Sequence, residues 1–380
     1  MEFSRRDALK FICLSCLSFT TFEGMEKNAF SIDLSNQFKK EEEFPKVEAK
    51  FYDKLKDGKI KCKICPQECE VTPNERGTCG TRENIEGKYY TLVHSRVCAA
   101  HIDPIEKKPL FHFLPGTKAL SIATPGCNIE CKYCQNWEIS QFRPEEIKCF
   151  YFPPRSVALT AKKYKCPTIA YTYTEPTIFY EYMYDTAVEG KRMGVKSVMI
   201  SNGYINRDPL VKLIPHLDAI KIDFKGFSEK FYSEICRGHL KPVLETLETI
   251  VEKKKWLEIV VLVIPTLNDS ISENRNMFKW IKTRLGDSIP VHLTRFYPIY
   301  KLKNLPPTPI STLENLYKTA QDVGLKFPYI GNVPGHPYES TYCPSCKKIL
   351  IHRVGFEILE NNIKNNRCPY CGEYIPGIFK

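Results

Sequence analysis

Three cysteines near the middle of the chain have the spacing of ligands for a reactive metal centre. They are Cys127, Cys131 and Cys134, a CxxxCxxC run that directly follows the apolar stretch 119–126. Three thiolates can hold a cubane iron–sulfur cluster and leave its fourth iron without a protein ligand. An open coordination position distinguishes a reactive centre from a closed structural one. The run therefore predicts a [4Fe–4S] cluster that binds a further molecule, and the alternative is a zinc knuckle with a fourth ligand such as Cys149.

Two further cysteine groups are typical of metal sites. The N-terminal group suits tetrahedral zinc or an iron–sulfur cluster equally well, and its simpler interpretation is a structural knuckle. The C-terminal group consists of two CPxC knuckles and predicts a zinc ribbon, with rubredoxin-like iron as the redox alternative. A tail of about 40 residues is too small to form a stable hydrophobic core without a bound metal ion. The N-terminal group comprises Cys62, Cys65, Cys69 and Cys79, and the C-terminal group comprises Cys343, Cys346, Cys368 and Cys371.

The composition is that of a globular protein. The chain has 380 residues, of which 43% are hydrophobic and 26% charged, and these values exclude the disordered, collagenous and membrane classes. Its 17 cysteines favour metal ligation over disulfides, because disulfide frameworks belong mostly to secreted domains of under ~100 residues. The net charge of +11 permits an acidic partner. Its basic residues are interleaved with acidic ones rather than gathered in a stripe, so a non-catalytic nucleic-acid-binding or electron-transfer protein is the disfavoured alternative.

The strands and helices that position these cysteines are predicted by two sequence patterns that alternate between residues 119 and 329. Short β-branched runs alternate with longer amphipathic ones, which is typical of βα units around a parallel sheet. The pattern predicts an α/β fold, a full or partial (β/α) barrel with its chemistry on loops at the carboxyl ends of the strands. The expected strands are 119–124, 168–174, 197–201, 219–224, 257–264, 291–296 and 327–330, and the expected helices are 156–164, 177–192, 243–254, 272–285 and 311–323.

The CxxxCxxC run after a first strand resembles the signature of radical S-adenosylmethionine (SAM) enzymes, in which the amino and carboxylate groups of SAM chelate the open iron. The segments 103–113 and 134–140 and the run Arg295-Phe-Tyr-Pro resemble one subgroup. It is the radical SAM protein of the AmmeMemoRadiSam system, related to pyruvate formate-lyase activating enzymes, and the resemblance covers about 62–379. It implies reductive cleavage of SAM to methionine and a 5′-deoxyadenosyl radical, which abstracts hydrogen from a substrate that the resemblance leaves open.

Polar residues near the first three strand ends are candidate contacts for SAM. Glu175 precedes a proline in an extended loop, where it can accept hydrogen bonds from a bound ammonium group. In radical SAM enzymes a Gly-Gly-Glu-Pro motif does this for SAM, and the Thr-Tyr-Thr-Glu-Pro of this chain lacks both glycines. Asn202 either meets the ribose hydroxyls or forms an ordinary Asn-Gly turn. Tyr133 is expected to pack beside the adenine.

Charged residues follow the later strands. Alternation places Lys221, Asp223 and Lys225 on one face of the fourth strand, toward the barrel interior. Three buried charges are costly unless they are paired or used. The pattern resembles the Asp-x-Lys of glycyl-radical activating enzymes, which implies that Asp223 and Lys225 lie near SAM and substrate. Arg295, at the end of the sixth strand, is expected either to clamp a carboxylate or phosphate or to pair with Asp223.

The sequence predicts four parts. Residues 45–115 form a Cys-rich region, 116–335 the barrel and 336–380 the zinc-ribbon-like or rubredoxin-like tail. Residues 1–30 resemble a twin-arginine signal, with Arg5 and Arg6 before the apolar run 11–22, or else form a short amphipathic helix. That run has 12 residues, fewer than the ~20 needed to span a bilayer.

The resemblance also carries expectations about partners. SAM and low-potential electron donors of the flavodoxin or ferredoxin type are cytosolic, so we expect a cytoplasmic site of action, although the N-terminal segment would permit export or membrane association. Association with Memo-like and AMMECR-like proteins is implied by the system's name. The substrate is expected to be either a protein, such as a glycyl-radical enzyme, or a metabolite.

Overall fold

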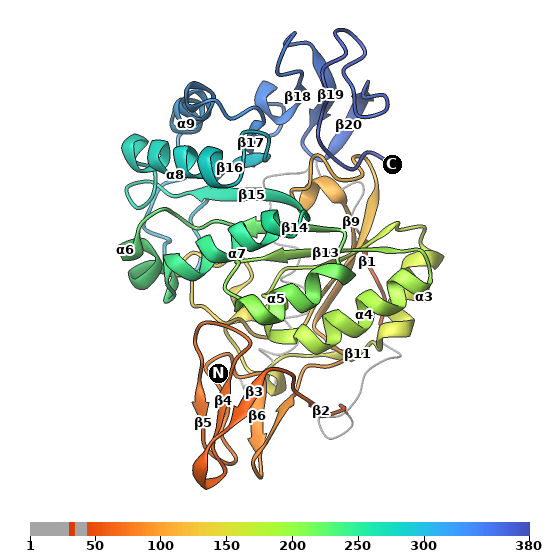
Figure 1. Cartoon of the computed structure of the whole chain (residues 1–380), viewed down its shortest axis with the longest axis vertical. Helices are drawn as coiled ribbons and strands as arrows, with labels where there is room; N and C mark the ends of the chain where they lie inside the picture. The colour runs from red at the N-terminus through yellow and green to blue at the C-terminus, as the bar shows by residue number, and fades with distance from the viewer. Residues whose placement is uncertain (1–29, 35–43) are drawn as a thin grey trace, which may run out of the picture.

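The centre of the molecule is a nine-stranded sheet with the order β1-β9-β10-β12-β13-β14-β15-β16-β17. The computed structural model describes residues 30–34 and 44–380. The seven strands from β10 to β17 in this order are parallel, and β1 and β9 extend one edge antiparallel. Because the pairing order begins at β1 and ends at β17, the sheet is an open, partial (β/α) barrel (Figure 1). The strands are β1 (Phe30–Ser31), β9 (Ala99–Pro104), β10 (Lys118–Ala123), β12 (Thr168–Tyr171), β13 (Lys196–Ser201), β14 (Ala219–Asp223), β15 (Trp256–Val263), β16 (Val291–Arg295) and β17 (Pro328–Gly331).

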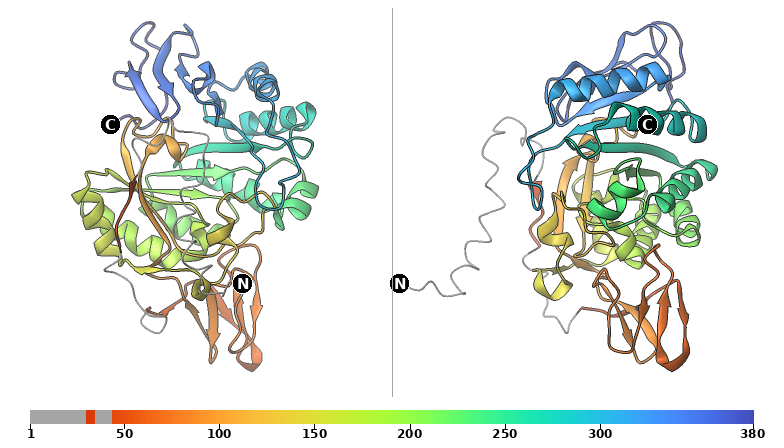
Figure 2. Two further views of the ribbon diagram at one scale, coloured as in Figure 1. Left: turned by 180° about the vertical axis from the view of Figure 1, so that it is seen from behind. Right: turned by 90° about the vertical axis from the view of Figure 1, so that its left-hand side faces the viewer.

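Helices connect the parallel strands and lie on the outer side of the sheet (Figure 2). Their apolar stripes face the strands, as in α7, where Val243, Leu247 and Ile250 are buried. The helices are α2 (Trp137–Ser140), α3 (Pro154–Lys163), α4 (Tyr180–Arg192), α5 (Arg207–Leu213), α6 (Glu229–Phe231), α7 (Leu240–Glu252), α8 (Ile271–Arg284) and α9 (Ile310–Val323). The seven expected strands and five expected helices are all present, with ends that differ by up to three residues.

One of the three-residue differences lies at the end of the second parallel strand. β12 ends at Tyr171 rather than at Thr174, because Tyr173 has a left-handed backbone with φ of 64° that no strand accommodates. Its hydroxyl donates to the buried carboxylate of Asp103, which also pairs with Lys108. The segment that begins at Asp103 thus fixes the loop that leads to Glu175.

The Cys-rich region forms two small antiparallel sheets at one end of the molecule (Figure 1). A buried ion pair between Arg82 and Glu181, 2.6 Å from Nη2 to Oε2, fastens this region to α4. The strands are β2 (Val47–Glu48), β6 (Arg82–Ile85) and β7 (Lys88–Thr91) in one sheet and β3 (Tyr52–Lys54), β4 (Ile60–Cys62) and β5 (Glu70–Val71) in the other. A separate pair joins β8 (Arg96–Val97) to β11 (Phe150–Tyr151).

The C-terminal tail forms a three-stranded sheet at the opposite end of the molecule (Figures 1 and 2). The buried side chain of Arg353 donates from Nη2 to the carbonyl of Phe111 at 2.8 Å. Glu258, at the amino end of β15, accepts from the backbone of Phe111 and His112 and from His292. These contacts fasten the tail to the barrel at the edge away from the carboxyl strand ends. The strands are β18 (Thr341–Tyr342), β19 (Ile349–Val354) and β20 (Glu357–Asn361).

Among the helices of residues 30–34 and 44–380, none is long and apolar enough to cross a membrane. The twin-arginine-like run 4–22 lies outside the described residues.

Candidate active site and metal centres

The CxxxCxxC cysteines lie on the loop between β10 and α2, at the carboxyl edge of the sheet. Backbone hydrogen bonds fix this loop, including one from Gly126 to Ile139 at 2.9 Å and one from Glu130 to Cys236 at 2.8 Å. Gly126 has φ of +103°, and a Cβ there would lie 2.5 Å from the Thr81 methyl carbon. A glycine therefore lets this loop pass against the Cys-rich region.

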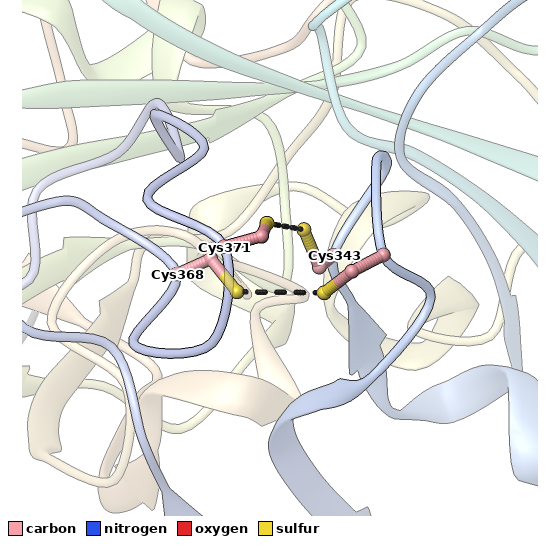
Figure 3. A group of neighbouring side chains, drawn as sticks. Cys343, Cys368 and Cys371 are labelled. Carbon is pink, nitrogen blue, oxygen red and sulfur yellow. Dashed lines mark hydrogen bonds between the residues drawn. The ribbon is translucent and has the colours of Figure 1, made fainter.

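The sulfur atoms of the tail cysteines lie close enough together for a single metal ion, whereas those of the other two cysteine groups stand farther apart. Among the described residues, the tail cysteines are the one group of potential ligands whose atoms all lie within 4.8 Å of one another. Figure 3 shows these sulfurs facing one another, with Cys343 3.5 Å from Cys371 and Cys346 3.7 Å from Cys368. A tetrahedral zinc ion with Zn–S bonds of about 2.3 Å has S–S edges of about 3.8 Å. The tail quartet fits a single ion of this kind.

The CxxxCxxC sulfurs stand farther apart than those of the tail quartet, which suits a cluster of several irons rather than one ion. Polar side chains accompany two of them. The sulfur of Cys134 lies 3.2 Å from the hydroxyl of Ser140, and Asn202 directs its amide toward the sulfur of Cys127 at 3.9 Å. Hydrogen bonds to ligand sulfurs tune the potential of an iron–sulfur cluster. The residues present thus fit a cluster of this kind.

Glu175 is a buried carboxylate that already accepts several hydrogen bonds. Oε1 accepts from the Thr177 backbone at 2.9 Å, the Thr177 hydroxyl at 2.7 Å and the Ser201 hydroxyl at 2.7 Å. Oε2 accepts from the backbone of Asn202 at 2.8 Å. Burial raises the pKa of this carboxyl, and the four donors oppose that increase. A carboxylate offers about four acceptor sites over two oxygens, so Oε2 is the atom with room for a ligand N–H group.

Asn202 forms the expected turn and also contacts the cluster loop. Its Oδ1 accepts from the backbone of Tyr204 at 2.8 Å, and Gly203 has φ of +76°. Its Nδ2 donates to Asn128 Oδ1 at 2.9 Å. The side chain is therefore committed to the turn and to the loop of Cys127, and contact with ribose hydroxyls stays a prediction.

Lys221, Asp223 and Lys225 lie together, as the alternation of β14 predicts. Lys221 Nζ contacts Asp223 Oδ1, and Lys225 Nζ lies 3.3 Å from Oδ2. Burial opposes the ionisation of Asp223, but the two lysines outweigh it and lower its pKa. Asn268 donates to the Lys225 carbonyl at 2.8 Å and so holds the following loop. The three charges form one paired group at the end of β14.

Arg295 is not the partner of Asp223. Its Nε donates to the carbonyl of Thr308 at 2.8 Å, and its Nη1 donates to the hydroxyl of Tyr297 at 3.3 Å. The guanidinium also lies 5.1 Å from the centre of the Tyr297 ring. Of the two alternatives for Arg295, the ion pair with Asp223 is not formed, because lysines contact both oxygens of that carboxylate. The carboxylate or phosphate clamp stays a prediction.

Tyr133 is buried next to a cysteine that sequence reasoning missed. Its hydroxyl lies 3.5 Å from the sulfur of Cys236, which follows α6 and is fully buried. Cys236 also forms a side-chain hydrogen bond that raises the pKa of Cys131. Cys236 stands on the connection after β14, and its place after a strand end is the signal that could have identified it. The sequence analysis named Cys149 only, as the fourth ligand of the zinc-knuckle alternative.

The N-terminal quartet lies in tight turns beside the CxxxCxxC loop. Cys62 and Cys65 are buried, and the backbone of Cys62 donates to the carbonyl of Cys69 at 2.9 Å. The backbone of Thr78 donates to the sulfur of Cys69 at 3.5 Å, and the sulfur of Cys79 lies 3.2 Å from the hydroxyl of Thr81. The quartet could hold a metal centre wider than a single ion.

A groove of about 1210 Å³ runs between the Cys-rich region and the CxxxCxxC loop. Cys79 and Gly80 line it from one side, and Cys127, Asn128 and Ile129 from the other. One cysteine of each group, Cys79 and Cys127, therefore lines the same depression in the surface.

Comparisons with known proteins identify a matching family model, similar sequences and a similar solved structure. The family model described as the radical SAM superfamily matches residues 121–278. An uncharacterized protein of Methanocaldococcus jannaschii is 48% identical over 330 residues, which cover 86% of this chain and 98% of that protein. A second uncharacterized protein of the same organism is 23% identical over 320 residues, 78% of this chain and 87% of that one. The solved structure of a radical SAM methyltransferase from Sphaerobacter thermophilus is similar with a TM-score of 0.48 and 12% identity, over 75% of this chain and 76% of that one.

Proposed function

The chain belongs to the radical SAM superfamily, and from this membership we propose an enzyme that cleaves SAM reductively and abstracts hydrogen from a polypeptide substrate. A [4Fe–4S] cluster, when bound, supplies the electron that breaks SAM into methionine and a 5′-deoxyadenosyl radical. The observation that carries the proposal is the connection of a buried carboxylate to the thiolate ligands. The backbone of Asn202 donates to Glu175 Oε2 at 2.8 Å, and its side-chain amide lies 3.9 Å from the sulfur of Cys127.

The residues of the chain have separate tasks in this proposal. Cys127, Cys131 and Cys134 hold the cluster, and Glu175 accepts an N–H bond from the amino group of SAM at Oε2. The donors around Glu175 keep it oriented, because Thr177 and Ser201 fix Oε1. Burial of this carboxylate excludes water and strengthens its hydrogen bonds.

Reductive cleavage is tested by product formation. The anaerobically reconstituted protein is expected to yield 5′-deoxyadenosine from SAM and dithionite, and Cys131→Ala is expected to yield none. Cys166→Ala is the matched control, because the Cys166 thiol is also buried but contacts the carbonyl of Tyr164 at 3.8 Å. Equal yields from Cys131→Ala and the wild type would refute the proposal.

A polypeptide substrate is preferred here to an anionic metabolite. A metabolite site at the strand ends would need free cations as clamps. Lys221 and Lys225 both pair with Asp223, and Arg295 donates to Thr308 and Tyr297. These pairings support a substrate bound through its backbone rather than through charge.

The substrate class is tested with candidate partners. A glycyl radical detected by electron paramagnetic resonance (EPR) after mixing with a glycyl-radical enzyme would support activation of a protein. Steady 5′-deoxyadenosine turnover with a metabolite and no protein radical would refute it. We propose Memo-like and AMMECR-like proteins as the first partners to test, and a flavodoxin- or ferredoxin-type protein as the electron donor.

The site of action is proposed to be the cytoplasm. SAM and low-potential donors are made there, and the reaction consumes both. Fractionation of cells that express the full chain tests this, and enzyme found only outside the inner membrane would contradict it.

Zinc is the proposed occupant of the tail quartet. The S–S distances of 3.5 and 3.7 Å support a single tetrahedral ion. The tail lies at the end of the molecule opposite the Cys-rich region (Figure 2), which supports a structural rather than a redox role.

A further inference from the structure

We propose that Cys62, Cys65, Cys69 and Cys79 hold a second iron–sulfur cluster, which passes single electrons from a low-potential donor protein to the cluster of the CxxxCxxC cysteines. The metal site stands on its own observations. The destination of the electron rests on the proposed function.

The first observation is the spacing of the sulfurs, for which the tail quartet is an internal standard. Both quartets consist of four cysteines in tight turns, yet in the described part of the chain the tail quartet alone closes to within 4.8 Å. The edges of a zinc tetrahedron, about 3.8 Å, match the tail. The N-terminal quartet shares its wider spacing with the CxxxCxxC cysteines. A four-iron cluster needs more room between its thiolates than a single ion does.

The second observation is the surroundings of the sulfurs. Cys62 and Cys65 are buried, Cys69 and Cys79 are partly exposed, and Cys79 lines the groove. Cys69 receives a hydrogen bond from the Thr78 backbone and lies 3.4 Å from the Thr78 hydroxyl. Burial together with hydrogen bonds to sulfur is the means by which proteins set the potential of such clusters.

The third observation is proximity to the catalytic cysteines. Gly126 precedes Cys127, and a Cβ on Gly126 would lie 3.1 Å from the carbonyl oxygen of Cys79. The two ligand loops are thus in direct contact. The buried pair of Arg82 and Glu181 holds the Cys-rich region against the barrel, so that this contact is maintained.

The groove gives a donor access to both groups. Cys79 and Cys127 line the same depression of about 1210 Å³. We place the donor on the Cys79 side of this groove, where Cys69 and Cys79 are partly exposed, so that it meets the N-terminal cluster first. In each transfer the donor loses one electron, the N-terminal cluster is reduced and reoxidised, and the catalytic cluster gains the electron. No bond changes until that electron is consumed in the cleavage of SAM to methionine and the 5′-deoxyadenosyl radical.

Metal analysis of the full chain tests the site. The anaerobically reconstituted wild type is expected to bind about eight irons and one zinc. Cys62→Ser/Cys65→Ser is expected to lose about four irons and keep zinc, whereas the matched variant Cys343→Ser/Cys346→Ser is expected to lose zinc and keep iron. Loss of one zinc with no loss of iron in the first variant would overturn the proposal.

EPR spectroscopy of the wild type tests for the second cluster without a variant, and so still applies if Cys62→Ser/Cys65→Ser does not fold. Two reduced clusters are expected to give two signals, of which SAM shifts one. A single signal that SAM shifts completely would overturn the second cluster.

The relay is tested by comparing electron sources. Cys62→Ser/Cys65→Ser is expected to form 5′-deoxyadenosine with dithionite but not with a ferredoxin- or flavodoxin-type donor. An unchanged ratio between the two sources would overturn the relay. Absence of 5′-deoxyadenosine from the wild type with dithionite would instead refute the proposed function, and the iron count would still report on the second cluster.

Discussion

Replacing Glu175 with glutamine removes the acceptor that we assign to the amino group of SAM. The carboxylate receives three donors at Oε1 and one at Oε2. A glutamine has one carbonyl oxygen, which the three donors would attract to the position of Oε1. Its amide nitrogen would then replace Oε2 and face both the backbone N–H of Asn202 and the SAM amino group.

The magnitude follows from the lost hydrogen bond. A hydrogen bond to a charged group contributes about 1.5–3 kcal/mol, which corresponds to a dissociation constant for SAM that is about 10- to 150-fold higher. The backbone N–H of Asn202 also loses its acceptor, so the free energy of unfolding is expected to fall by about 1–3 kcal/mol.

Anaerobic titration of SAM into reconstituted protein of matched iron content measures this effect. Thr177→Val is the control, because it removes one hydroxyl donor to Oε1 at 2.7 Å and keeps the carboxylate charge. The control is expected to bind SAM within a few-fold of the wild type. Wild-type affinity in Glu175→Gln at full iron content would refute the assigned role of Glu175.

Further predictions concern other charged and metal-binding residues. Burial raises the pKa of Glu106 from 4.5 to about 7, so the wild type loses stability as the pH rises from 4.5 through 7. The free energy of unfolding of Glu106→Gln should therefore rise relative to that of the wild type, by up to about 3 kcal/mol across that pH range. Urea unfolding of both proteins at several pH values measures this difference, and a difference that does not change with pH would contradict the prediction. Cys343→Ser/Cys346→Ser should lower the melting temperature together with zinc content, and loss of one iron in place of zinc would contradict a zinc tail. Asp223→Asn leaves two lysines unpaired and should lower the free energy of unfolding by about 1–3 kcal/mol, with partial recovery on adding Lys221→Met; an unchanged unfolding curve would refute the pairing.

Local patterns account for the parts of the fold that the sequence predicts. Continuous apolar runs such as Val198–Ile200 indicate burial within a parallel sheet, and cysteine spacing indicates metal ligation directly. Glu175 lies next to Ser201 and Asn202, because the carboxyl ends of adjacent parallel strands meet at one edge, and its contact with SAM stays a prediction.

The features that the sequence did not predict depend on contacts far along the chain. The antiparallel strand β9 lies outside the βα repeat, and its pairing with β10 follows from tertiary packing. The position of Cys236 beside Cys131 depends on a connection about 100 residues away, closed by backbone bonds to Glu130 and Lys132. The contact of Arg295 with Thr308 was not predicted, because Thr308 lies on a loop without a recognisable pattern.

The central claim is that SAM coordinates the cluster held by Cys127, Cys131 and Cys134. Pulsed EPR of the reduced protein with SAM labelled with nitrogen-15 at the amino group measures this contact. The account predicts a hyperfine coupling between that nitrogen and the cluster. Saturating SAM, confirmed by equilibrium dialysis, with no such coupling would contradict it.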